Sequence, residues 1–247
     1  MKNDEGGNVM DIIVALPEDS TLTSTQRRSG VNHRSPTFIG DGAQYLSNPF
    51  CSTMTAQHAG SSRASSQSLQ KLKKLLSNGP LPSLFVFDLD YTLWSAYIDC
   101  TGGPPYQLLP PSTASDTVLD RHGHPISLYS NARSILKTLH AHKCKIGVAS
   151  RSETPGWARQ VLRLMFDKEL IAEDTVEIYP TSKVKHFKAF RKNTGVDYSE
   201  MLFFDDENRN VVQVEKLGVK SRYVERGITI DEISEGIQDW REQRGTV

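Results

Sequence analysis

The segment LFVFDLDYTLW, from Leu84 to Trp94, runs through four apolar residues and then places two aspartates, Asp88 and Asp90, two positions apart. A short apolar run without alternation is typical of a strand buried on both faces, as in a parallel sheet. Burying carboxylates at the end of such a strand is costly unless they have polar or charged partners. The segment therefore predicts a buried strand that ends at a functional site.

Short apolar runs of this kind recur down the chain, separated by segments with apolar residues at helical spacing. The runs are LFVFD (84–88), CKIGVAS (144–150), VEIYP (176–180), MLFFD (201–205) and VKSRYVE (219–225). The last helical segment opens with Thr229 and Glu232 at the spacing of a capping box. Strands that alternate with helices predict right-handed βαβ units covered on both faces. We expect an α/β domain with a doubly wound parallel sheet over residues 80–240.

The N-terminal part of the chain has a different composition. Residues 1–65 are rich in Ser, Gly, Asn and Thr without a sustained apolar period, and such a segment buries too little apolar surface to offset the entropy cost of ordering. We expect a disordered extension there. Residues 66–79 place leucines at helical spacing and end at Gly79, before Pro80, which predicts a short amphipathic helix leading into the domain.

Composition excludes several classes of protein. The 247 residues have a formal net charge of +0 and a pI of about 7.1, which argues against a nucleic-acid partner. No apolar run is long enough to span a bilayer, so we expect no membrane association. Three cysteines without a CxxC pair favour a reducing compartment over a disulfide framework. These features predict a cytoplasmic protein, with nuclear access left open, and they leave the oligomeric state unknown.

Polar residues follow the predicted strands. They are Asp88 and Asp90 after the first run, Ser150 and Arg151 after the second, Lys183 after the third, and Asp205 with Asp206 at the end of the fourth. In open parallel sheets, ligands bind beyond the carboxyl ends of the strands, where the winding reverses. We therefore expect these side chains to meet in one crevice.

The residue types in this set suit the transfer of a phosphoryl group. Asp88, Asp205 and Asp206 would repel one another unless a cation lay between them, and an all-oxygen set favours Mg²⁺ that keeps some water. Lys183 and the metal would neutralise the phosphate, while the Ser150 hydroxyl and a backbone N–H hold its oxygens.

Two carboxylates then remain for chemistry. Asp88 is placed to attack phosphorus in line and form an aspartyl-phosphate. Asp90 is placed to protonate the leaving alcohol and later to take a proton from the hydrolytic water. The sequence predicts a Mg²⁺-dependent phosphomonoesterase.

The segment between the first two runs, residues 91–129, bears on specificity. It has too many prolines and too little periodicity for a helical cap, so we expect a loop with a small hairpin near DRHGHPISLY and no large cap domain. Trp94 and Tyr97 could form an aromatic wall that binds substrate, or Trp94 could instead pack beneath the loop. His122 and His124 are interpreted as turn residues rather than a metal pair, because no third ligand has suitable spacing.

The ordered motifs DLDYT, ASRS, SKV and FFDDEN resemble those of the haloacid dehalogenase (HAD) superfamily, whose fold is a Rossmann-like sheet. The longer stretches FDLDYTLW, IYPTSKVKHF and FFDDENRN are similar to its magnesium-dependent phosphatases, and the likeness covers residues 84–227. The resemblance implies Asp88 as nucleophile and Asp90 as acid/base. The implied metal ligands are Asp88, Asp90 (through its backbone carbonyl), Asp205 and Asp206. The implied phosphate- and substrate-binding residues are Ser150, Lys183 and Arg151.

The resemblance also implies candidate substrates, namely phosphotyrosine in proteins and phosphorylated sugars, including sugar-amine adducts. Two alternatives stay open. One is a catalytically inactive module of this fold that binds a partner. The other is a sugar-phosphate phosphomutase, although such an enzyme usually needs a cap to exclude water.

Overall fold

The computed structural model describes residues 62–111 and 116–245. Residues 1–61 of the expected extension lie outside this part of the chain. Helix α1 (Ser62–Ser77) begins four residues before the helix expected at 66–79. Its leucines Leu72 and Leu76 are buried, which ties the helix to the domain core.

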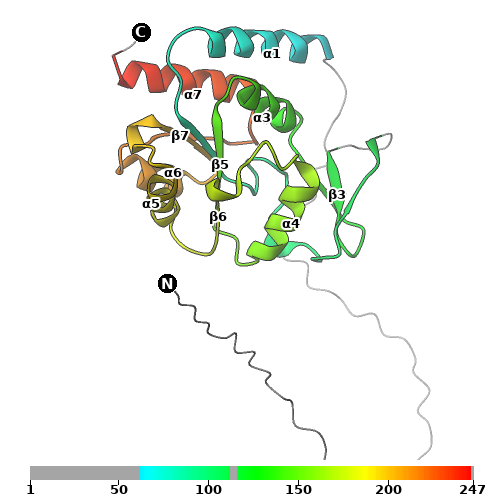
Figure 1. Ribbon diagram of the computed structural model, residues 1–247. Helices are drawn as coiled ribbons and strands as arrows, with labels where there is room; N and C mark the ends of the chain where they lie inside the picture. Colours follow the sequence, from blue (N-terminus) through cyan, green and yellow to red (C-terminus); the bar gives the residue numbers. More distant parts are fainter. Residues whose placement is uncertain (1–61, 112–115, 246–247) are drawn as a thin grey trace, which may run out of the picture. The chain divides into compact units, whose positions relative to one another are not determined.

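The centre of the domain is a parallel sheet of five strands in the order β6-β5-β1-β7-β8 (Figure 1). The strands are β1 (Leu84–Phe87), β5 (Lys145–Ser150), β6 (Val176–Ile178), β7 (Met201–Asp205) and β8 (Lys220–Tyr223). β1 lies in the middle and pairs in parallel with β5 on one side and β7 on the other. The winding therefore reverses at β1. The predicted doubly wound parallel sheet is confirmed.

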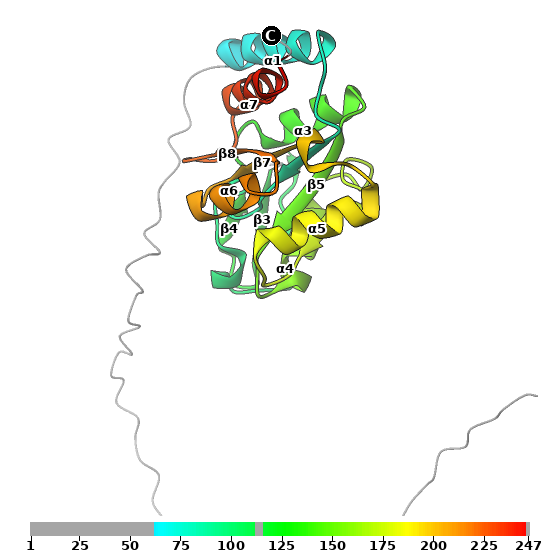
Figure 2. The ribbon, with the colours of Figure 1, turned by 90° about the vertical axis from the view of Figure 1, so that its left-hand side faces the viewer.

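Helices cover both faces of this sheet (Figure 2). They are α3 (Ala132–Ala141), α4 (Pro155–Met165), α5 (Lys183–Thr194), α6 (Asn208–Glu215) and α7 (Ile230–Gln243). Alternate residues of β1 point to opposite faces: Phe85 and Phe87 pack in the core under α3, α4 and α7, while Leu84 and Val86 pack with α5 and α6. This two-sided burial explains why β1 is apolar throughout.

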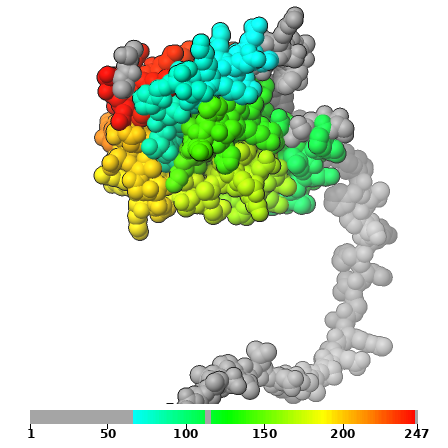
Figure 3. All heavy atoms as spheres, turned by 45° about the horizontal axis from the view of Figure 1, so that its top comes forward, coloured from blue at the N-terminus to red at the C-terminus, as the bar shows by residue number. Residues whose placement is uncertain are grey.

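Helix α1 forms an outer element on one face. It packs on α7 and α3, and Figure 3 shows its atoms, in cyan, across the top of the domain. The cap of α7 is partly as predicted, because the Thr229 hydroxyl accepts from the Glu232 backbone N–H at 3.1 Å. The Glu232 carboxylate, however, binds the Arg222 guanidinium. Among the described helices, none is long and apolar enough to cross a membrane.

The segment after β1 folds more than expected. It contains the 3₁₀ helix η1 (Ile98–Cys100) and a small antiparallel sheet of β2 (Gln107–Leu108), β3 (Thr117–Leu119) and β4 (Pro125–Ser127). β3 and β4 form the expected hairpin, and the Asp120 carboxylate at its tip accepts from the backbone N–H groups of Gly102, His122 and His124. β2 adds a strand that the sequence did not predict. No helical cap domain covers the carboxyl edge among the described residues.

The remaining short elements are two 3₁₀ turns, η2 (Glu173–Thr175) and η3 (Tyr198–Glu200), which precede β6 and β7. They lead the chain into these strands at the amino edge of the sheet. The opposite, carboxyl edge is left to loops, and these loops carry the polar residues singled out from the sequence.

Candidate active site

A cavity of about 210 Å³ lies at the carboxyl edge of the sheet, where the winding reverses at β1. Its lining is mostly polar and charged: Asp88, Asp90, Tyr97, Asp99, Ser150, Arg151, Ser152, Glu153, Lys183, Asp206, Glu207, Arg209 and Asn210. These residues come from the segment after β1, from the end of β5 and the loop that follows it, from the start of α5, and from the loop after β7 with the start of α6, so segments far apart in the sequence form one site.

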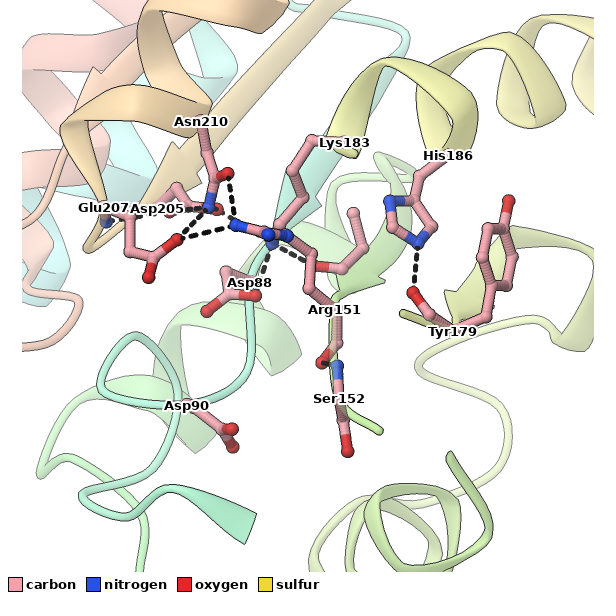
Figure 4. A network of polar contacts seen from close by, with 12 residues as sticks. Asp88, Asp90, Arg151, Ser152, Tyr179, Lys183, His186, Asp205, Glu207 and Asn210 are labelled. Atoms are coloured by element: carbon pink, nitrogen blue, oxygen red, sulfur yellow. Dashed lines mark hydrogen bonds and ion pairs between the residues drawn. The ribbon is translucent and has the colours of Figure 1, made fainter. Parts of the chain in front are cut away.

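Lys183 lies at the centre of the polar network (Figure 4). Its side chain is 1% exposed, and its ammonium contacts the Asp88 carboxylate, the Ala149 carbonyl at 2.6 Å and Asp205 Oδ2 at 2.8 Å. Burial alone would lower the pKa of Lys183, but the charges of Asp88 and Asp205 outweigh it and raise the pKa. The amine is therefore a buried cation held between two strand tips.

Three carboxylates gather at this point, and two of them contact the Lys183 ammonium. Asp88, Asp205 and Asp206 each offer an oxygen, and the three oxygens lie within 4.8 Å of one another. Burial raises the pKa of Asp88 even though Lys183 opposes it, and burial together with Asp205 raises the pKa of Asp206 to about 7. The cluster has an excess of negative charge that a divalent cation would neutralise, and its all-oxygen donor set fits Mg²⁺.

The two neighbouring aspartates at the end of β7, Asp205 in the strand and Asp206 directly after it, differ in position. Asp205 is fully buried, and its Oδ1 accepts from the Glu207 backbone N–H at 2.8 Å and from Asn210 Nδ2 at 2.9 Å. Asp206 instead lines the cavity. Asp205 therefore links Lys183, Glu207 and Asn210 beneath the cavity. Asp206 lies on the cavity wall, where a ligand would bind.

Asp90 lies two residues beyond Asp88 and also lines the cavity. Its Oδ1 accepts a hydrogen bond from the Trp94 indole Nε1 at 2.7 Å. Burial, followed by the charge of Asp88, raises the pKa of Asp90 to about 7. A carboxyl group of this kind can exchange a proton near neutral pH.

Of the two alternatives left open for Trp94, the structure favours packing beneath the loop over an aromatic wall that binds substrate. Trp94 is fully buried, because the turn after β1 carries the chain back over the core: the backbone N–H groups of Leu93 and Trp94 both bond to the Leu89 carbonyl. Tyr97 lines the cavity instead, with 49% of its surface exposed. Its ring meets the Tyr91 ring edge-on, with centroids 4.6 Å apart.

The turn that carries the aspartates is braced from the C-terminal part of the domain. The Ile228 backbone N–H donates to the Thr92 carbonyl at 2.9 Å. The preceding residue, Gly227, lies against Tyr129 so closely that a Cβ there would be 2.2 Å from the ring, and its φ of +80° also favours glycine. The turn after β1 is thus held in place by the segment that follows β8.

Ser150 and Arg151 follow β5 on the other side of β1. Ser150 is buried and lines the cavity, and its hydroxyl oxygen accepts from the Ser152 backbone N–H at 3.3 Å. Arg151 reaches across to Glu207 Oε2 at 3.2 Å and Asn210 Oδ1 at 3.4 Å. Its guanidinium therefore links the loop after β5 to the loop after β7.

Besides Tyr97, the structure brings seven of the residues named from the sequence to this site. They are Asp88, Asp90, Ser150, Arg151, Lys183 and Asp206 on the cavity wall, with Asp205 directly bonded to Lys183 beneath it. The sequence reasoning did not single out Asp99, Ser152, Glu207, Arg209 and Asn210. For the last three, their place in FFDDENRN directly after β7 was a usable signal. For Asp99 the sequence offered none.

Comparisons with known proteins show the family to which the chain is similar. The family model described as Acid Phosphatase matches residues 80–243. Magnesium-dependent phosphatase 1 of Homo sapiens is 39% identical over 158 residues, which span 64% of this chain and 86% of that protein. A HAD-like hydrolase superfamily protein of Schizosaccharomyces pombe is 41% identical over 152 residues, which span 59% of this chain and 87% of that protein.

Solved structures show a more distant likeness. The phosphatase domain of a Bacteroides fragilis protein complexed with Mg matches with a TM-score of 0.45 and 16% identity, over 72% of this chain and 43% of that chain. A HAD-superfamily hydrolase from Ehrlichia chaffeensis matches with a TM-score of 0.46 and 14% identity, over 66% of this chain and 99% of that chain.

Proposed function

The chain belongs to the acid phosphatase family, in the part that contains the magnesium-dependent phosphatases, and we propose that it hydrolyses phosphomonoesters through an aspartyl-phosphate on Asp88. One observation carries the proposal. Three carboxylates with oxygens within 4.8 Å of one another lie beside a single buried ammonium at the switch point of the sheet. Such a cluster suits a divalent cation and a phosphate group bound side by side.

The residues present fit Mg²⁺. Asp88, Asp205 and Asp206 would hold the ion, and the resemblance to the family adds the backbone carbonyl of Asp90. When bound, the ion would neutralise charge on the phosphoryl oxygens and hold the phosphate against the nucleophile.

The chain's own residues account for both half-reactions. In the first, an Asp88 carboxylate oxygen forms a bond to phosphorus as the bond to the leaving oxygen breaks, and Asp90 gives its proton to that oxygen. In the second, Asp90 takes a proton from water, whose oxygen attacks phosphorus and releases inorganic phosphate from Asp88. Burial holds the pKa of Asp90 at about 7, which suits a group that must both give and take a proton near neutrality.

Ser150 and Lys183 would bind the phosphate during both steps. The Ser150 hydroxyl lies on the cavity wall and can donate to a phosphoryl oxygen. Lys183 already neutralises Asp88 and Asp205, so its position is fixed before the substrate arrives. A preorganised cation of this kind stabilises charge that develops on the phosphoryl group without needing to move.

For the substrate, we propose phosphotyrosine in proteins, with phosphorylated sugars and sugar-amines as the second class. Tyr97 supports the first class, because its half-exposed ring on the cavity wall can stack against an aryl leaving group. The open carboxyl edge, without a cap among the described residues, leaves room for a protein chain. The small volume of the cavity, about 210 Å³, also suits a sugar phosphate.

The test is Asp88→Asn, assayed with a phosphotyrosyl peptide and a panel of sugar phosphates in the presence of Mg²⁺. We expect the wild type to turn over at least one class and the variant to lose turnover by about 10³-fold or more, since an amide oxygen is a poor nucleophile. Asp174→Asn, at an exposed residue of η2, is the matched control. Full activity of Asp88→Asn would end the nucleophile assignment, and an inactive wild type would favour the binding module.

A further inference from the structure

Asp99 is an acidic residue of the cavity that the proposed chemistry does not use. It lies in η1, within the segment that follows β1, yet its carboxylate bonds to the loop that follows β5. Two separate parts of the site therefore meet at this one side chain.

The contacts of Asp99 are numerous and short. Its Oδ1 accepts from Ser152 Oγ at 2.6 Å, from Thr154 Oγ1 at 2.5 Å and from the Thr154 backbone N–H at 3.1 Å. Its Oδ2 accepts from the Glu153 backbone N–H at 3.1 Å. These hydrogen bonds lower the pKa of Asp99 although burial opposes them, so the group is ionised at neutral pH. One carboxylate thus fixes three consecutive residues of the loop.

The same loop orients Ser150. The backbone N–H of Ser152 donates to Ser150 Oγ at 3.3 Å, and the Ser152 side chain is held by Asp99. A serine hydroxyl has one proton to donate and two lone pairs that accept. The Ser152 backbone N–H approaches one lone pair of Ser150 Oγ, so the Ser150 hydroxyl proton points in another direction. Since Ser150 lines the cavity, that proton can be donated to a group bound there.

The Asp99 carboxylate also contacts the residues that precede helix α4. Thr154 precedes α4, and its hydroxyl does not cap its own helix but donates to Asp99. The carboxylate accepts the backbone N–H groups of Glu153 and Thr154 next to the positive end of the helix dipole. The loop is thereby held at both ends, by β5 before it and by α4 after it.

We propose that Asp99 is a positioning residue that aims the Ser150 hydroxyl at the phosphate through Ser152. The inference rests on the proposed phosphatase function and adds to it a link between the segment after β1 and the phosphate-binding loop after β5. Asp99 itself need not touch the substrate. It acts by fixing the donor geometry before the phosphate binds, which is where preorganised sites gain most of their advantage.

The experiment is a double-variant cycle on the full chain. Asp99→Ala is measured in the wild-type background and in the Ser150→Ala background, with p-nitrophenyl phosphate turnover and with the affinity for inorganic phosphate in Mg²⁺ by calorimetry. In the wild-type background we expect a loss of about 10- to 100-fold in kcat/KM and a matching loss of phosphate affinity. In the Ser150→Ala background we expect almost no further loss, because the group that Asp99 positions is gone. Equal losses in both backgrounds, or no loss in either, would overturn the proposal.

Two further variants separate positioning from folding. Asp99→Asn keeps an acceptor oxygen for Ser152 and Thr154, so it should recover most of the activity that Asp99→Ala loses. Ser152→Ala should reproduce the loss of phosphate affinity while leaving the Mg²⁺ concentration for half-maximal turnover unchanged. Asp167→Ala, which removes only an exposed ion pair with Lys137, is the control. A changed Mg²⁺ requirement in Ser152→Ala would contradict the proposed route.

The two proposals fail in different ways. If the wild type binds phosphate but hydrolyses no ester, the proposed function is wrong, and the phosphate affinities of the variants still decide the role of Asp99. If the wild type hydrolyses esters and Asp99→Ala keeps its full phosphate affinity and turnover, only the inference about Asp99 is wrong.

Discussion

On one side of β1 the site residues predicted from the sequence are carboxylates, whereas on the other side they carry hydroxyl, guanidinium and ammonium groups. β7 ends at Asp205 and is followed by Asp206, while β5 ends at Ser150 and is followed by Arg151. Asp88 lies on the boundary between the two. The difference shows how one edge can bind opposite charges: the acidic side suits a cation, the other side suits phosphoryl oxygens, and the proposed nucleophile reaches both.

Lys183 joins the two sides, and Lys183→Met is expected to have the largest effect. The change leaves Asp88 and Asp205 buried without their shared cation, so we expect kcat/KM to fall by about 10³-fold or more and the free energy of unfolding in EDTA to fall by about 3–5 kcal/mol. Urea unfolding and steady-state kinetics measure both. Lys185→Met, at an exposed position on the same helix, is the control. If the free energy of unfolding of Lys183→Met lay within about 1 kcal/mol of wild type, the ion pairs of Lys183 with Asp88 and Asp205 would be dispensable for stability.

Asp206→Asn tests whether the acidic side is the metal side. It removes one negative charge from the cavity wall, so the Mg²⁺ concentration for half-maximal turnover should rise by about tenfold or more. Ser150→Ala, on the other side of β1, should instead raise KM and leave the Mg²⁺ requirement unchanged. Equal changes in the Mg²⁺ requirement of the two variants would abolish the distinction between the sides.

Trp94→Phe tests how much the proposed acid/base group, Asp90, depends on the Trp94 indole. The change removes the hydrogen bond from Nε1 to Asp90, and we expect kcat to fall by about 3- to 10-fold. Trp240→Phe is a matched control, because its buried indole donates to the Ser199 carbonyl at 2.8 Å, in the layer of α7. Both variants should lose about 1 kcal/mol of stability, and only the first should lose turnover. A similar loss of turnover in both would point to a general effect on folding.

Tyr97→Ala has the smallest expected effect and concerns the substrate. Loss of the ring should lower the ratio of kcat/KM for a phosphotyrosyl peptide to that for a sugar phosphate by about 3- to 10-fold. Tyr223→Ala, at a tyrosine of β8 with 45% of its surface exposed, is the control. An unchanged ratio would mean that Tyr97 does not contact the leaving group.

Most of the site could be predicted from the sequence because parallel strands end at a common edge. Once LFVFD, CKIGVAS and MLFFD were interpreted as strands of one sheet, their terminal residues Asp88, Ser150 and Asp205 had to lie near one another. The position of Lys183 followed in the same way, since it begins the helix that returns from β6. Regular backbone geometry placed these residues, and no knowledge of loop conformation was needed.

The loop conformations were harder to predict from the sequence, because the path of a loop depends on contacts between residues far apart in the chain. The bond between Asp99 and Ser152 joins segments 53 positions apart, and no local pattern marks either residue as a partner. β2 escaped prediction because both of its residues, Gln107 and Leu108, are exposed and so lack an apolar period. The side chain of Trp94 could have pointed to the cavity or to the core, and the hydrogen bonds of the turn after β1 decided between them.

The hydrogen bond from Ile228 to Thr92, with Gly227 packed against Tyr129, has a consequence for biosynthesis. Chains leave the ribosome N-terminus first, so the loop bearing the proposed nucleophile emerges long before the stretch that clamps it. A nascent polypeptide that ends before residue 227 already contains Asp88 and Asp90, the side chains proposed to make and break bonds. It still lacks the hydrogen bond from the Ile228 backbone N–H to the Thr92 carbonyl. We therefore expect the loop that bears the proposed nucleophile to lack this brace until residues 227–228 have been synthesised and have packed against it.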